Sequence, residues 1–221
     1  MITLRVDVPF ASFRKSFARS FAETYPLPPP ATIYGMLLSL VGERFRARHE
    51  GVRLAFAFKR LPHIATTLRK LSRFKYGVPS KQSKLGNAPD FIETLCGLEF
   101  LCWVDSTNEM PNKGPTARHD SRLLESRIIE AINTPNRVQR YGVLCLGLSD
   151  DAVNEIELCE ILEGTWLRLV PRDTGDLELP IWVDHVGSFT TRWQRYHLDT
   201  QPTEVHIQPP VEQFTTIAAP I

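Results

Sequence analysis

The sequence predicts an α+β fold: a ferredoxin-like domain with a loop insertion, followed by a small β-rich lobe. Two amphipathic helical patterns separate runs of alternating apolar residues. Their order (strand, helix, strand, strand, helix, strand) is that of a ferredoxin-like sheet. Short strand-like runs and turn residues follow. We expect the first domain at 1–150, with its insertion around 77–121, and the lobe with an extended tail at 151–221.

The first elements are expected to be a strand at 2–8 and a helix at about 32–48. Alternating Ile, Leu and Val residues indicate the strand, and an apolar stripe at helical spacing indicates the helix. The stripe consists of Ile33, Leu37, Leu40, Val41 and Phe45. Three prolines precede it, so the helix starts either with Pro30 as an early helical residue or with Thr32 as its N-cap.

The middle of the chain predicts further strands. Residues 52–59 alternate as in a half-buried strand. Residues 64–76 combine helical spacing with strand-favouring residues, so the pattern alone leaves both open. A basic loop at 77–90, a short helix at 90–96 and a strand at 98–104 are expected next.

The remaining elements follow a long polar connector at 105–121. A second helix is expected from about residue 123 to the turn at 133–136, and an apolar strand at 141–148. Short strands are expected within 153–197. The last 24 residues carry four prolines and are expected to form an extended arm.

The charge of the chain is unevenly distributed. Residues 1–85 hold 16 Lys/Arg and four Asp/Glu, whereas residues 86–221 hold 10 and 21. This asymmetry indicates a surface for a polyanion in the first half, unless the two halves neutralise each other across an internal interface.

Composition narrows the class of protein further. No run of about 18 apolar residues occurs, so we expect no membrane span. We also expect no secretory signal, because no basic segment followed by an apolar one begins the chain. Four cysteines without metal-ligand spacing indicate reduced thiols, which are typical of a cytoplasmic protein.

Two motifs carry a family resemblance. Residues 24–37 read Thr-Tyr-Pro-Leu-Pro-Pro-Pro-Ala-Thr-Ile-Tyr-Gly-Met-Leu, and residues 140–149 read Arg-Tyr-Gly-Val-Leu-Cys-Leu-Gly-Leu-Ser. The first resembles the N-terminal signature of the Cas-five family, CRISPR-associated RAMP proteins that cap the 5′ end of the guide RNA in Cascade-type complexes. The second is similar to the Gly-x-Leu-x-Leu-Gly-x-Ser segment of that family. Length and element order are most similar to the DevS-like branch.

The resemblance implies a fold and a function. It favours a ferredoxin-like (RRM/RAMP) domain in which 64–76 is a strand, paired with 52–59 through a turn at Pro62. It implies a non-catalytic subunit that holds the 5′ handle of the crRNA and contacts the Cascade backbone and large subunits and, through the complex, target DNA near the PAM. A thumb insertion of the family corresponds to either 77–89 or 105–121.

The candidate RNA-binding residues are cations interleaved with aromatic residues. Cations bind phosphates and aromatic rings stack on unpaired bases. A helix N-terminus beside such cations also favours phosphate, because its first N–H groups are free. Gly35 is included because the family brings RNA close to this turn. The set is Arg14, Lys15, Arg19, Tyr25, Gly35, Arg69, Lys70, Arg73, Lys75, Tyr76, Lys81 and Lys84. The alternatives are that these aromatic residues belong to the core and that Gly35 serves helix packing.

Two other functions remain open. Some relatives cut repeat RNA without metal by using a Tyr and a Lys-His pair, and the nearest equivalents here are Arg118 and His119 with Tyr25 or Tyr34. The alternatives are therefore a metal-independent endoribonuclease or a protein assembly scaffold. We expect no metal site and no cofactor.

Overall fold

The computed structural model describes residues 1–15, 18, 21–73, 86–110, 122–184 and 190–220. Two α-helices and three short 3-10 helices lie within these ranges: α1 (Pro30–Leu40), α2 (Leu124–Asn133), η1 (Arg46–His49), η2 (Pro135–Arg137) and η3 (Val211–Gln213). Eleven strands accompany them: β1 (Ile2–Ala11), β2 (Phe21–Ala22), β3 (Arg53–Phe58), β4 (His63–Arg73), β5 (Gly86–Asp105), β6 (Glu155–Leu158), β7 (Thr165–Pro171), β8 (Leu177–Trp182), β9 (Arg192–Leu198), β10 (Thr203–Glu204) and β11 (Thr215–Thr216). No helix of the described part is long and apolar enough to cross a membrane.

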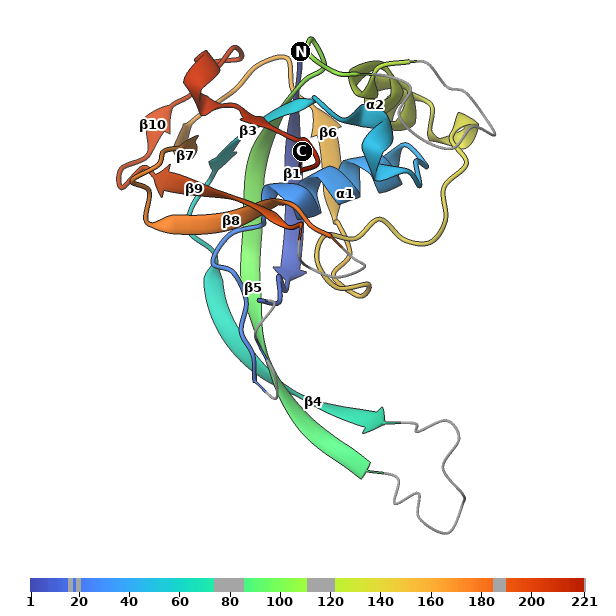
Figure 1. The fold of residues 1–221 in the computed structure, drawn as a ribbon, viewed down its shortest axis with the longest axis vertical. Helices are drawn as coiled ribbons and strands as arrows, with labels where there is room; N and C mark the ends of the chain where they lie inside the picture. Colours follow the sequence, from blue (N-terminus) through green and yellow to red (C-terminus); the bar gives the residue numbers. More distant parts are fainter. Residues whose placement is uncertain (16–17, 19–20, 74–85, 111–121, 185–189, 221) are drawn as a thin grey trace.

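One twisted sheet organises the body. Its main path runs β6-β1-β5-β3-β7-β9-β8, and every neighbouring pair on this path is antiparallel. The helices α1 and α2 follow β1 and β5 along the chain (Figure 1). The strands expected at 2–8, 52–59 and 98–104 are confirmed, and so is the second helix. The tail returns to the body, where β11 pairs with β3.

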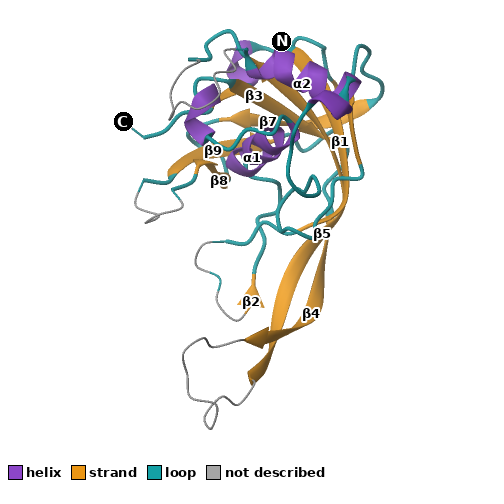
Figure 2. Ribbon diagram, turned by 90° about the vertical axis from the view of Figure 1, so that its right-hand side faces the viewer, coloured by secondary structure: helices purple, strands orange, loops and turns teal. Residues whose placement is uncertain are grey.

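A two-stranded ribbon leaves the body. Strand β4 pairs with the first half of β5 from His63 opposite Cys96 to Arg73 opposite Gly86, and the ribbon projects far beyond the other strands (Figures 1 and 2). The predicted strand at 64–76 is thus confirmed, but its predicted pairing with 52–59 is wrong. Both edges of β3 are already occupied by β5 and β7. The helix expected at 90–96 is also wrong, because this segment forms the ribbon ladder.

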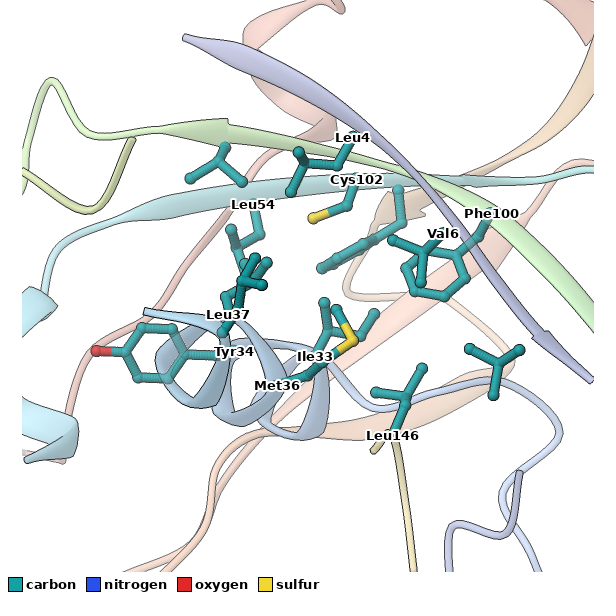
Figure 3. Packing of buried hydrophobic residues seen from close by; sticks show 14 of the residues in the cluster. Leu4, Val6, Ile33, Tyr34, Met36, Leu37, Leu54, Phe100, Cys102 and Leu146 are labelled. Atoms are coloured by element: carbon teal, nitrogen blue, oxygen red, sulfur yellow. The ribbon is translucent and has the colours of Figure 1, made fainter. Parts of the chain in front are cut away.

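Helix α1 packs its apolar face onto the sheet (Figure 3). Ile33, Tyr34 and Leu37 are fully buried against sheet residues such as Leu54 and Phe100. Full burial of one such side chain stabilises the fold by about 1.5–3 kcal/mol. The core therefore fixes the position of this helix.

At the start of α1, the alternative with Pro30 as an early helical residue is confirmed, because the helix begins at Pro30 after Pro29 as N-cap. The predicted end is wrong, because the helix ends at Leu40 instead of 48. Gly42 terminates it with φ of +68°, and a methyl group there would lie 2.2 Å from the Gln139 carbonyl oxygen. Phe45, expected in the buried stripe, is consequently 40% exposed.

The strand expected at 141–148 is not formed. Cys145 makes one isolated bridge to Ala152, and the neighbouring residues are turns and bends. Tyr141 and Val143 are exposed. The edge beside β1 is taken instead by β6, so the apolar run at 144–146 packs into the core from a turn.

A buried polar network joins four segments of the body. The side chains of His49 and Glu109 have no solvent exposure, and His49 Nδ1 is hydrogen-bonded to the Glu109 carboxylate. Arg127 donates to His49 Nε2 (2.7 Å) and to Glu43 (2.8 Å), while Glu109 accepts the Leu124 N–H (2.9 Å). Because arginine can only donate, Nε2 is the acceptor and Nδ1–H donates to Glu109. The network therefore fixes η1, α2 and the segment after α1 relative to one another through the carboxylates of Glu43 and Glu109.

Replacing Glu109 by alanine should destabilise the protein by about 3–5 kcal/mol at pH 7, because it breaks a buried charged network. Although burial alone raises the pKa of Glu109, hydrogen bonds from His49 and from the Leu124 N–H lower it below its usual range. The stabilisation is therefore complete above the unfolded pKa of about 4.3 and is lost as pH falls through the folded pKa. Urea unfolding at pH 7 and at about pH 3.5 measures both effects.

Glu130→Ala is the matched control, because the Glu130 carboxylate forms an ion pair with the half-exposed Arg122 (2.6 Å). That pair is worth less than about 1 kcal/mol. Equal losses in the two variants, or a Glu109 effect of the same size at both pH values, would contradict this assignment.

Candidate nucleic-acid interface

The loop between β1 and α1 is fastened to β5 by backbone N–H groups. Phe13 N–H donates to Thr24 Oγ1 (2.8 Å), and Thr24 N–H donates to the Glu93 carboxylate (3.0 Å). Between Phe13 and Thr24 in the sequence, Phe21 and Ala22 form β2, which pairs in parallel with β5. The loop thereby becomes a third strand beside the base of the ribbon (Figure 2).

A tight turn joins the second sequence motif to this loop. The buried Asp151 carboxylate accepts the Ser12 N–H (2.7 Å) and the Leu148 N–H (2.8 Å). Gly147 has φ of +112°, and a methyl group there would lie 2.7 Å from the Ser12 carbonyl oxygen. The Asp151 side chain therefore stabilises this turn, as aspartate side chains in turns commonly do. This turn joins the second motif to the segment that precedes the first motif, and residues of both motifs line a hollow where α1 begins.

A hollow of about 350 Å³ opens where α1 begins. Its lining includes Arg14, Tyr25, Thr32 and Trp193. The first turn of the helix offers fewer free donors than expected, because Pro29 and Pro30 have no N–H. The N–H groups of Thr32 and Ile33 both donate to the Pro29 carbonyl (2.8 and 3.1 Å). An anion in this hollow would therefore rely on the exposed Arg14 more than on the helix.

The other described residues of the predicted set near this hollow have definite positions. Lys15 donates to Glu23 (3.0 Å), and Arg14 donates to the Ala18 carbonyl (2.7 Å). Tyr25 is nearly buried, lies 6.3 Å from the Trp193 ring in a tilted arrangement, and has a pKa raised by burial and by Glu178. Trp193 is 41% exposed. Its position beside Tyr25 has no signal in the sequence, because it comes from the far end of the chain.

Tyr34 occupies the interior. Its ring is fully buried, and its hydroxyl donates to the Arg46 carbonyl at 2.5 Å. Burial raises its pKa far above the usual range. In this position the Tyr34 hydroxyl is a core hydrogen-bond donor and does not face an external RNA strand.

An exposed apolar row crosses the base of the ribbon. Phe21 on β2, Phe91 on β5 and Leu68 on β4 are direct register partners, with 41%, 47% and 63% of their surfaces exposed. Ile64 lies four residues before Leu68 on the same strand and is 54% exposed. Directly paired residues project from the same face of a sheet. Sequence reasoning missed Phe91, because segment 90–96 was expected to be helical.

The basic stretch follows this row along the ribbon. Arg69, Lys70 and Arg73 are β4 residues at register positions opposite Asp90, Pro89 and Gly86. The other predicted positions lie outside the described residues: Arg19, Lys75, Tyr76, Lys81, Lys84, Arg118 and His119. The structure thus brings the β4 cation positions, the apolar row and the N-terminal loop to the same half of β5.

Gly35 is exposed on α1, and a methyl group there would meet no atom within 4 Å. Packing within this chain therefore does not explain the glycine. Charge pairing between the halves does occur elsewhere: Arg5 contacts Glu99 and Glu157 (2.9 Å each), and Arg53 contacts Asp105. Part of the basic excess of the first half is neutralised in this way.

Comparisons with known proteins identify a family to which this chain is similar. A family model described as CRISPR-associated protein (Cas_Cas5) matches residues 1–90. A curated relative from Myxococcus xanthus, "CRISPR-associated protein Cas5", is 38% identical over 221 residues, covering 98% of this chain and 97% of the relative.

Two solved structures share the fold. One, described as "CRISPR RNA-guided surveillance complex", has a TM-score of 0.54 at 16% identity and covers 96% of this chain and 95% of its own. The other, described as "Crystal structure of Cas protein", has a TM-score of 0.51 at 15% identity, with coverages of 91% and 94%.

Replacing Asp151 by alanine should lower the free energy of unfolding by about 2–4 kcal/mol, because one buried and one partly buried backbone N–H group lose a charged acceptor. Chemical denaturation measures the loss. Asp150→Ala removes the same charge from an exposed neighbour and should cost clearly less. An equal cost at both positions would show that the turn does not depend on the Asp151 carboxylate.

Proposed function

The chain belongs to the CRISPR-associated Cas5 family, and from this premise we propose that it is a non-catalytic RNA-binding subunit of a type I CRISPR effector of the Cascade kind. It holds the 5′ handle of the crRNA and contacts neighbouring backbone and large subunits. The observation that carries the proposal is the ribbon, where a stretch with three cationic residues follows an exposed row of apolar and aromatic side chains.

The ribbon offers the two interactions that single-stranded RNA requires. Exposed Phe21 and Phe91 on adjacent strands can stack on unpaired bases, and a stacked base contributes about 1–3 kcal/mol. Arg69, Lys70 and Arg73 supply cations for the phosphates at the adjoining positions of β4. A solvent-exposed apolar row of this kind would otherwise be costly on a sheet edge.

The sheet supports the same proposal. In it, β6-β1-β5-β3 with α1 and α2 form the ferredoxin-like RAMP domain, and the ribbon of β4 and β5 is the thumb, in keeping with the 77–89 alternative. The ladder of β4 and β5 favours this assignment over the 105–121 connector. A structural neighbour described as a CRISPR RNA-guided surveillance complex is consistent with it.

The proposal of a non-catalytic role rests on the position of Tyr34. Metal-independent cleavage needs a base for the 2′-hydroxyl, a proton donor and a cation. The buried Tyr34 hydroxyl is held by the Arg46 carbonyl and is not available as such a group. Arg118 and His119, which lie outside the described residues, stay the candidates if cleavage occurs.

The direct test uses the purified chain and 5′-labelled repeat RNA in EDTA, examined on native and denaturing gels. We expect the RNA to stay intact and to shift. The double variant Arg69→Ala/Arg73→Ala should weaken binding about tenfold or more and reduce the salt slope by about 1.4, since each lost phosphate contact removes about 0.7.

Arg172→Ala/Arg195→Ala is the charge-matched control, because these exposed residues lie on the β7–β9 side of the body. Cleavage abolished by His119→Ala would replace the proposal with an endoribonuclease. Binding that is absent, or equal in both double variants, would favour the scaffold alternative.

A second prediction concerns Gly35. Because a methyl group there meets open space, Gly35→Ala should stabilise the exposed helix position by about 0.5–1 kcal/mol. If the RNA backbone approaches this turn, the same variant should bind the repeat RNA several-fold more weakly. Thermal unfolding and the gel shift measure the two effects separately. Ser39→Ala on the same helix is the control for propensity, and RNA affinity that is unchanged by Gly35→Ala would exclude the close approach.

A further inference from the structure

A second basic site lies at the other end of α1. A cavity of about 380 Å³ opens between the end of this helix, α2 and the segment after η2. Figures 1 and 2 place α2 and the ribbon at opposite ends of the molecule. The charged residues that line the cavity are Arg44, Arg48, Arg122, Arg127, Arg137, Glu43 and Glu130.

Carboxylates neutralise only part of this charge. Glu43 contacts both Arg127 (2.8 Å) and Arg48 (3.3 Å), and Glu130 contacts Arg122 (2.6 Å). Within the part of the chain that the structure describes, Arg44 and Arg137 form no ion pair. Both are exposed. The exposed guanidinium groups of Arg44 and Arg137 therefore give this cavity a positive charge that favours an anion.

Two exposed aromatic rings line the same cavity. The guanidinium carbon of Arg44 lies 4.1 Å from the centre of the Tyr141 ring, and that of Arg48 lies 5.8 Å from the centre of the Phe45 ring. Tyr141 is 62% exposed and Phe45 is 40% exposed. Inorganic phosphate would contact only the cations, whereas a nucleotide would contact the cations with its phosphate and stack its base on an aromatic ring.

Contacts with two backbone carbonyl groups hold the walls of the cavity together. The carbonyl of Gln139 packs against Gly42 so closely that only glycine fits. Arg127 donates to the Val41 carbonyl (3.0 Å), which joins α2 to the end of α1. The segment that carries Arg137 and Tyr141 is therefore fixed opposite Arg44 before any ligand binds.

From this geometry we propose that the cavity binds a nucleoside phosphate, with its phosphate on Arg44 and Arg137 and its base against Tyr141. The volume lies within the range of about 300–1,000 Å³ typical of small-ligand sites. The nucleotide is either a free mononucleotide or a terminal residue of an RNA chain. The inference is independent of the ribbon, since it uses other residues at another end of the protein.

The test uses saturation-transfer NMR and calorimetric titration of the full chain with adenosine, uridine, guanosine and cytidine 5′-monophosphates. We expect at least one to bind, and Arg44→Ala/Arg137→Ala to weaken it at least tenfold. Tyr141→Ala should reduce saturation of the base protons. Its side chain is exposed, so this variant keeps the fold, which thermal unfolding verifies.

A charge-matched variant and an RNA comparison make the outcome decisive. Arg172→Ala/Arg195→Ala should bind the mononucleotide as the unmodified chain does. A 5′-phosphorylated RNA octamer that binds more tightly than the mononucleotide identifies an RNA end as the source, and weaker or equal binding identifies a free nucleotide.

The proposal is overturned if no mononucleotide binds, or if the cavity variants bind like the unmodified chain. It is also overturned if inorganic phosphate competes as strongly as the nucleotide, or if an oligoglutamate peptide binds the cavity and nucleotides do not. Failure of ribbon binding to repeat RNA would leave this result unaffected.

Discussion

The pairing of β5 is the constraint on which the rest of the structure depends. Its 20 residues form one continuous strand, of which the second half lies between β1 and β3 and the first half pairs with β4 and β2. Gly97, with φ of +71°, marks the junction where the strand passes from ribbon to body. The ribbon is therefore an extension of the hydrophobic core ladder, and its orientation is set by the buried residues of the sheet.

Periodicity in the sequence was sufficient for elements whose buried face is local. Alternating apolar residues correctly predicted β1 and β3, and helical spacing correctly predicted α2. Partner choice was not predictable, because β4 pairs with β5, and the edges of β3 are taken by β5 and by β7 from much later in the chain. The run at 141–148 also failed, since a buried carboxylate at Asp151 stabilises a turn there. Periodicity carries no information about that hydrogen bond.

The candidate site was predictable to a similar degree. Local sequence indicated the basic stretch of β4 and the loop before α1, since clustering of cations is visible in one dimension. The row of Phe21, Phe91 and Leu68 depends on the register of three strands, and Trp193 reaches Tyr25 only through tertiary packing. Phe45 was predicted in the core because its spacing continues the stripe, but Gly42 ends the helix before it.

The contacts of the Glu109 carboxylate also bear on the number of residues between Glu109 and Leu124. It binds His49 on one side and the Leu124 N–H on the other, so Glu109 and Leu124, 15 residues apart in the sequence, meet at one buried carboxylate. The entropy of closing a loop rises only slowly with its length, by about 0.6 kcal/mol per doubling. A change in the number of residues between Glu109 and Leu124 therefore adds little to the entropy cost of bringing these two residues together.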